Sequence, residues 1–171
     1  MSLPIKLSCI ARRMFHPKVA YAHCDIPCGI YDPHAAQIAA LTVIRMNQLV
    51  QNLAKPGANA TAAETAAYDA ALTRYVAVKE QHAELCKNEL RILWGDYFRP
   101  EHIKEYPDLH DRFFNAMKLA SRARQQNDMD AAQQLLTAVH GIAEIFWKTK
   151  GAKSQKQPSR QTVGGELVYP A

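Results

Sequence analysis

The sequence lacks the features that define several large protein classes. Its 171 residues include only four cysteines, too few for a disulfide scaffold in a chain long enough to bury a core without one. No apolar run approaches the roughly 20 residues that a membrane-spanning helix needs. We find no internal repeat and no Gly-rich phosphate loop. We therefore expect one globular domain outside the membrane, in which apolar residues make up 48% of the chain.

A basic groove for nucleic acid is also missing. The formal charge is +5, but residues 1–22 contribute +4 and residues 151–171 contribute +2, which leaves residues 23–150 at about −1. The excess positive charge therefore belongs to the two ends and not to the folded body. We expect no nucleic-acid partner and no membrane partner.

Apolar residues recur at helical spacing in four segments, which are 33–55, 61–98, 107–125 and 128–150. Helix-start signals precede three of them. Asp32-Pro33 offers an N-cap and a first-turn proline, Thr61 with Glu64 has the form of a capping box, and Asp128 is placed as an N-cap. Gly151 is placed to end the last helix. The fold class predicted is all-α, an antiparallel four-helix bundle preceded by an irregular N-terminal metal-binding hook.

The two ends of the chain are predicted to lie outside this bundle. Residues 1–22 end in Ala20-Tyr21-Ala22, which resembles a secretory cleavage site, but Arg12, Arg13 and Lys18 interrupt the apolar region that a signal peptide needs. We predict a cleaved pro-segment at 1–22 in a cytoplasmic protein. Residues 151–171 have few large apolar groups, so we predict a flexible tail.

The segment between the pro-segment and the first helix concentrates metal-binding groups. His23, Cys24 and Cys28 place an imidazole and two sulfurs within six residues. Nitrogen and thiolate donors in a planar arrangement suit nickel or copper, whereas a structural zinc site needs four protein ligands. The chain has no second Cys-x-x-Cys pair and no His-x-x-x-His pair to complete a zinc site. If the chain began at His23, its amine and imidazole, the Cys24 amide and the two thiolates would be five donors on one loop.

The stretch HCDIPCGIYDP, from His23 to Pro33, resembles the nickel hook of nickel superoxide dismutases. Two later stretches resemble further segments of that family: LWGDYFRPEHIKEYPDLH at 93–110 and IFWKTK at 145–150. The resemblance extends over most of residues 23–150. The hook is its most specific part.

This resemblance implies a bundle that assembles as a homohexamer with one nickel ion per subunit, and superoxide as substrate. His23, Cys24 and Cys28 are the implied metal ligands, Tyr31 would stand beside the open face of the metal, and Asp25 would help to fix the hook. A maturation protease would cleave between Ala22 and His23, because the amine of His23 becomes a ligand only after cleavage.

The sequence departs from the family at two positions. A glutamate on the first helix and an arginine on the second orient the axial imidazole in family members, but Ala39 and His82 stand at the matching positions here. No carboxylate occurs between Asp32 and Glu64, so a neighbouring residue of the first helix cannot replace the glutamate. We expect His82 to substitute in part for the arginine, and the tuning of the axial ligand to differ from that in family members.

Two readings from other classes remain beside the dismutase. A thiol-disulfide protein would use Cys24 and Cys28 without cleavage at His23, and a non-enzymatic metal-binding bundle would keep the hook but lack turnover. Cys86 is expected to be a buried apolar residue, and His34, His102, His110 and His140 are expected at helix surfaces or starts. No Glu-x-x-His pair supports a di-iron bundle.

Overall fold

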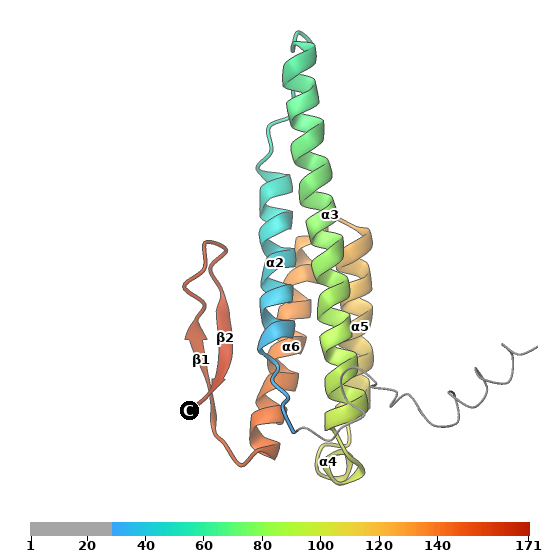
Figure 1. Cartoon of the computed structure of the whole chain (residues 1–171), viewed down its shortest axis with the longest axis vertical. Helices are drawn as coiled ribbons and strands as arrows, with labels where there is room; N and C mark the ends of the chain where they lie inside the picture. Colours follow the sequence, from blue (N-terminus) through green and yellow to red (C-terminus); the bar gives the residue numbers. More distant parts are fainter. Residues whose placement is uncertain (1–28) are drawn as a thin grey trace, which may run out of the picture.

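The computed structural model describes residues 29–171, which Figure 1 shows in colour. The predicted pro-segment at 1–22 and the predicted site residues His23, Cys24, Asp25 and Cys28 lie outside the described residues. None of the helices within 29–171 is both long and apolar enough to cross a bilayer.

Four helices form the body of the protein, as the apolar periodicity predicts. They are α2 (His34–Gln51), α3 (Ala62–Ile92), α5 (Leu109–Gln125) and α6 (Met129–Thr149). Each helix packs against the next, and α2 packs against α6, so the four enclose one core (Figure 1). The fully buried side chains at its centre include Val43, Ala83, Phe113, Leu135 and Phe146. The prediction of a four-helix bundle is confirmed.

The predicted capping signals act at the starts of the helices. The Thr61 hydroxyl accepts a hydrogen bond from the Glu64 amide at 3.2 Å, and the Glu64 carboxylate accepts one from the Thr61 amide at 2.8 Å. Asp128 accepts from the Ala131 amide at 2.9 Å. Asp32 accepts from the His34 amide at 2.7 Å, although α2 begins one residue later than predicted. These bonds satisfy amide groups that have no partner inside their own helices.

The end of the second helix differs from the prediction of a continuous helix to Phe98. After Ile92 the chain widens into a π-helical turn, η1 (Leu93–Tyr97), and then becomes extended at Phe98 and Arg99. Arg99 is extended because it precedes Pro100, which disfavours helical geometry at the residue before it. A short helix, α4 (Pro100–Glu105), follows. This reversal stacks the ring of His102 on that of Tyr97, with centroids 5.7 Å apart.

The prediction of a flexible tail at 151–171 is wrong. Gly151 adopts a φ of +73° and ends α6 as predicted, but the chain beyond it forms an antiparallel hairpin of β1 (Ser154–Pro158) and β2 (Glu166–Pro170). Figure 1 shows this hairpin beside α2 and α6. Leu167 and Val168 of the hairpin are buried against the bundle, with 1% and 2% of their surface exposed.

Candidate metal centre

The first described residues continue directly from the predicted hook. Gly29, which follows Cys28, has a φ of +72°, in the left-handed region that glycine adopts without the steric cost of a Cβ. A residue with a Cβ would be strained at this position. The chain then passes through Tyr31 and Asp32 into the first turn of α2.

A pocket of about 340 Å³ lies at this point of the chain. Its walls come from the segment after the hook, from η1 and α4, and from the end of α6. The lining residues are Gly29, Tyr31, Asp96, Tyr97, Arg99, Glu101, His102, Thr149 and Lys150. The first described residues thus lie at a pocket that η1, α4 and the end of α6 also line.

Tyr31 is half-buried in this pocket and packs against Tyr97, with ring centroids 5.5 Å apart and planes tilted by 53°. The hydroxyl of Tyr97 lies 2.7 Å from Oγ1 of Thr149. Because Thr149 donates its only hydroxyl hydrogen to the Phe146 carbonyl, Tyr97 is the donor in that bond. Tyr97 is therefore fixed at both its ring and its hydroxyl, and it forms a rigid wall beside Tyr31.

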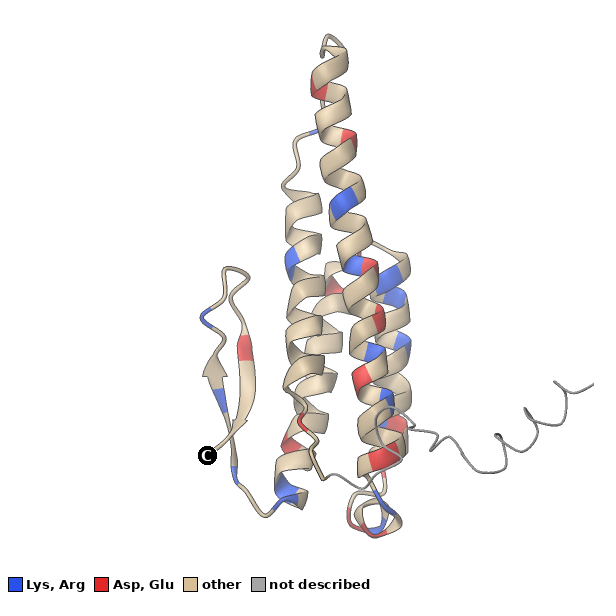
Figure 2. Ribbon diagram, viewed as in Figure 1, with Lys and Arg blue, Asp and Glu red and all other residues tan. Residues whose placement is uncertain are grey.

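Charges around the pocket are balanced. Arg99 and Lys150 face Asp96 and Glu101 in the lining, so the wall carries no net charge from these four groups. The Lys150 ammonium lies 5.0 Å from the centroid of the Tyr97 ring, within the range of a cation–π contact. Elsewhere on the bundle, the ribbon in Figure 2 shows acidic and basic residues interspersed along α3, where Glu84 pairs with Arg124 of α5 at 2.8 Å.

His102 is fixed in the wall of the pocket. Its Nδ1 accepts a hydrogen bond from the Arg99 amide at 3.1 Å. This bond and the stacking on Tyr97 place His102 in the pocket, whereas the sequence predicted only a helix surface or start. Pocket residues from η1 and α4 lie within the stretch 93–110 that resembles the dismutase family, and that resemblance was the available signal for them.

The two departures from the family pattern are both on helices of the bundle. Ala39 is buried in α2 with 1% of its surface exposed. Its methyl side chain has no hydrogen-bonding group. His82 lies on α3, and its Nδ1 is 2.9 Å from the Val78 carbonyl of the same helix. A carbonyl can only accept, so Nδ1 carries the hydrogen and Nε2 is left as the acceptor.

The bundle itself contains no alternative metal site among residues 29–171, because no three histidine, cysteine or acidic residues lie close enough together there to hold an ion. Cys86 is the free cysteine in this part of the chain, and it is fully buried, as predicted. Burial raises the pKa of its thiol to about 12, so it is not a thiolate at neutral pH. Neither ligation nor thiol exchange is available to Cys86.

Comparison with known proteins decides the family. The model of the nickel-containing superoxide dismutases matches residues 18–150. The chain belongs to the nickel-containing superoxide dismutase family. The nickel superoxide dismutase of Streptomyces coelicolor is 38% identical over 141 residues, which cover 82% of this chain and 98% of that protein. The enzyme of Streptomyces seoulensis is 40% identical with the same coverage.

Solved structures agree with this assignment. The native structure of a nickel superoxide dismutase superposes with a TM-score of 0.64 at 36% identity, over 75% of this chain and 99% of that one. A structure whose nickel ligation corresponds to the oxidised state has a TM-score of 0.62 at 38% identity, over 76% of this chain and 100% of that one. The predicted fold, nickel cofactor and superoxide dismutase function are confirmed, and the thiol-disulfide and non-enzymatic readings are not favoured.

Proposed function

We propose that His23, Cys24 and Cys28 hold the nickel ion of this family member, one ion per subunit, after cleavage between Ala22 and His23. The donor set fits the metal, because thiolates and nitrogen donors suit nickel and a deprotonated amide together with two thiolates stabilises its higher oxidation state. Bound there, nickel supplies one-electron chemistry by alternating between its divalent and trivalent states. One superoxide is oxidised to oxygen and a second is reduced, with two protons, to hydrogen peroxide.

One observation carries this proposal. Gly29 and Tyr31 stand one and three residues after Cys28 in the sequence. Both line the pocket between η1, α4 and the end of α6. A metal held by the hook therefore lies next to a pocket with room for a small anion and water. The absence of another group of metal-binding residues within 29–171 points to the same segment.

Tyr31 is the pocket residue proposed to act on the substrate. Its contact with Tyr97 restricts the ring, which supports a role for its hydroxyl at a fixed position in the pocket. There Oη orders a water or the superoxide and provides a hydrogen bond to the peroxide product. Asp25 is proposed to fix the hook, through hydrogen bonds from its carboxylate to the loop. Both roles are those that the family resemblance implies.

Cleavage before His23 is proposed as the activating step. While Ala22 is joined to His23, the nitrogen between them is an amide, whose lone pair is delocalised into the carbonyl and which binds metal only after losing its hydrogen. Release of residues 1–22 converts it into an amine and supplies the missing donor. A maturation protease is therefore a required partner, and the absence of an uninterrupted apolar signal region favours maturation in the cytoplasm.

A homohexamer is the proposed assembly. It follows from the family resemblance and is supported by large apolar side chains on the outside of the subunit. Trp94 and Phe114 are 41% and 56% exposed, a cost that burial in a subunit contact would remove. Light scattering on the purified protein gives the subunit number directly, and a monomer at micromolar concentration would reject the hexamer.

The ligand assignment is tested by replacing single cysteines in the protein that begins at His23. Cys28→Ser and Cys24→Ser each remove one thiolate, so we expect loss of stoichiometric nickel binding and of dismutation. Cys86→Ala is the matched control, because Cys86 is buried in α3 with a thiol that stays protonated. Full nickel binding by both serine variants would reject the proposed ligands.

A further inference from the structure

Within residues 29–171, the C-terminal hairpin is the packed element that the family match leaves out. The match to the nickel-containing superoxide dismutases ends at residue 150, whereas β1 and β2 occupy residues 154–170. The hairpin is nevertheless built into the bundle, because Leu167 and Val168 are among its buried residues. Its contacts with α2 indicate what it does.

The side chain of Gln37, on α2, forms two hydrogen bonds with the backbone of Val168 in β2. Its side-chain amide donates from Nε2 to the Val168 carbonyl at 3.1 Å, and its Oε1 accepts from the Val168 amide at 2.7 Å. Both bonds are buried. Val168 stands opposite Lys156 in the hairpin, and its own amide and carbonyl point away from β1. The side chain of Gln37 thus takes the place of a third strand at the inner edge of the hairpin.

A side chain of α6 binds the next backbone carbonyl on the same edge of β2, that of Glu166. Nε2 of His140, on α6, lies 3.0 Å from the Glu166 carbonyl, two residues before Val168. The strand edge is therefore closed by one side chain from α2 and one from α6. This arrangement ties the two helices together through the hairpin.

The contacts of β2 with α2 are made at the first turn of α2, a few residues after the predicted metal-binding segment. The backbone amide of Gln37 donates a hydrogen bond to the Pro33 carbonyl at 3.2 Å, in the first turn of α2. In the same turn the ring of His34 lies against that of Tyr169, with centroids 5.7 Å apart. In Figure 1 the end of β2 lies toward the end of α2 that begins at His34. Tyr31 of the pocket is three residues before His34.

We infer that the C-terminal hairpin is a brace that fixes the first turn of α2 and so holds the metal-binding segment in position, with Gln37 and Tyr169 as its positioning residues. The inference rests on the proposed function for its effect on nickel. The hairpin contributes no residue to the proposed ligand set or to the lining of the pocket beside Tyr31. It limits the angles at which the chain leaves α2 toward the hook.

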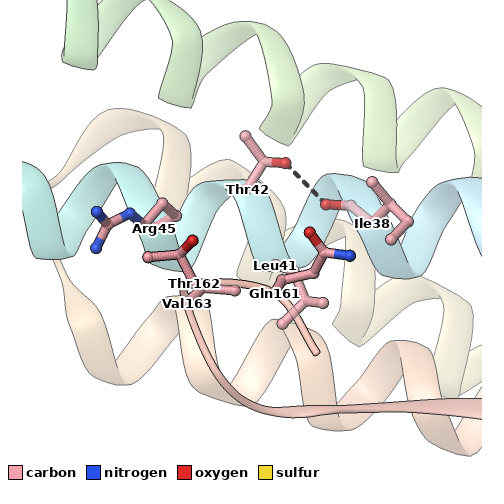
Figure 3. A pocket seen from close by; sticks show the side chains of 7 residues that line it. All are labelled: Ile38, Leu41, Thr42, Arg45, Gln161, Thr162 and Val163. Carbon is pink, nitrogen blue, oxygen red and sulfur yellow. Dashed lines mark hydrogen bonds between the residues drawn. The ribbon is translucent and has the colours of Figure 1, made fainter. Parts of the chain in front are cut away.

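The turn of the hairpin contacts α2 beyond its first turn and offers a control. Its turn covers α2 over a cavity of about 360 Å³, where Gln161, Thr162 and Val163 lie opposite Ile38, Leu41, Thr42 and Arg45 (Figure 3). Next to it, Nε2 of Gln48 donates to the Val163 carbonyl at 3.4 Å. Gln48 is three helical turns beyond Gln37, a separation of about 16 Å at 1.5 Å per residue.

The test compares Gln37→Leu with Gln48→Leu in the nickel-loaded protein that begins at His23. The two variants make the same chemical change in contacts of one helix with one hairpin. Nickel release is followed after addition of an excess of chelator, and the nickel absorption spectrum is recorded. We expect Gln37→Leu to release nickel roughly tenfold faster, the lower end of the effect of groups that orient metal ligands. Gln48→Leu should stay within about twofold of the parent protein.

Amide hydrogen exchange in the metal-free protein separates this inference from the proposed function. Gln37→Leu should raise exchange in the first two turns of α2, whereas Gln48→Leu should not, and this readout needs no nickel. Tyr169→Leu keeps the Gln37 bonds and should accelerate nickel release less, in the same direction. Equal release and equal exchange in the two glutamine variants would overturn the brace, even where the parent protein binds nickel and is active. A parent protein without nickel binding would reject the proposed ligands while the exchange data still decide on the brace.

Discussion

The four-helix bundle and the C-terminal hairpin are held in place by different kinds of contact. In the bundle, apolar side chains at helical spacing fill a common core, as Phe113 and Leu135 do with none of their surface exposed. In the hairpin, the two buried apolar residues Leu167 and Val168 are accompanied by polar side chains that reach out from α2 and α6. Bundle stability thus comes mainly from apolar burial, and hairpin placement depends on a few specific hydrogen bonds and close contacts.

The largest effect should follow from a cavity in the bundle. Phe113→Ala removes a fully buried ring whose centroid lies 5.5 Å from that of Phe98. We expect a loss of about 3–5 kcal/mol in the free energy of unfolding. Thermal or urea unfolding measures it, and the exposed neighbour Asn115, changed to alanine, is the control with an expected change below about 0.5 kcal/mol. Similar losses in both variants would contradict the core described for α5.

These different contacts explain which elements the sequence predicts. The four helices follow from local patterns, such as the 3, 4 spacing of apolar residues and the capping signals at Thr61 and Asp128, which act within a few residues. The hairpin does not follow from local patterns, because the residues that hold it are distant in the sequence. Gln37, for example, is 131 residues from Val168. Composition alone predicts a flexible tail, because the partners of Leu167, Val168 and Glu166 come together only on the folded bundle.

The next effect concerns the close approach of the hairpin to the helices. Gly164 and Gly165 both have a φ of +75°, but a Cβ on Gly165 would lie 3.1 Å from Cδ2 of Leu41, whereas one on Gly164 would meet nothing within 4 Å. Gly164→Ala should cost about 1–2 kcal/mol of backbone strain. Gly165→Ala should add overpacking of about 1–3 kcal/mol against α2.

Limited trypsin cleavage after Arg160, under native conditions, reports how often the hairpin opens. Cleavage of Gly165→Ala should be roughly tenfold faster than that of Gly164→Ala, which corresponds to about 1.4 kcal/mol. Equal cleavage rates would show that the hairpin does not press on Leu41. Global unfolding of the bundle should change less than hairpin opening in either variant.

The smallest effect is a pH dependence of the hairpin contact. Burial lowers the pKa of His140 below its ordinary value of 6.5, and Lys156 lowers it further, while the Glu166 carbonyl and the carboxylates of Glu144 and Glu166 oppose the shift. Because the folded protein favours the neutral ring, His140 contributes stability above about pH 6.5 that is lost as pH falls through its lowered pKa.

Unfolding at pH 7.5 and pH 5.0 tests this dependence when His140→Gln is compared with the parent protein. The glutamine variant keeps an amide donor but cannot titrate, so it should lose less stability between the two pH values. Parallel losses would assign the acid effect to carboxylates elsewhere. The difference should be smaller than that caused by either alanine substitution at Gly165 or Phe113.

In the metal site, as in the fold, local features are predicted from the sequence and long-range features are not. The ligands His23, Cys24 and Cys28 are predicted from the hook motif, because all donors lie within six residues. The pocket beside them is not apparent from local spacing, because Tyr31, Tyr97 and Lys150 come from three distant segments. Tyr97 lies in the π-helical turn η1, and its ring contacts Tyr31 of the segment after the hook.

The most direct test of the account compares two purified proteins, one beginning at His23 and one retaining residues 1–22, each incubated with nickel. Bound nickel per chain and superoxide dismutation are measured on both. The account predicts one nickel per chain and dismutation only in the protein that begins at His23. Equal activity in the form that retains residues 1–22, or no nickel in the cleaved form, would contradict the assignment of the metal to a hook that starts with the amine of His23.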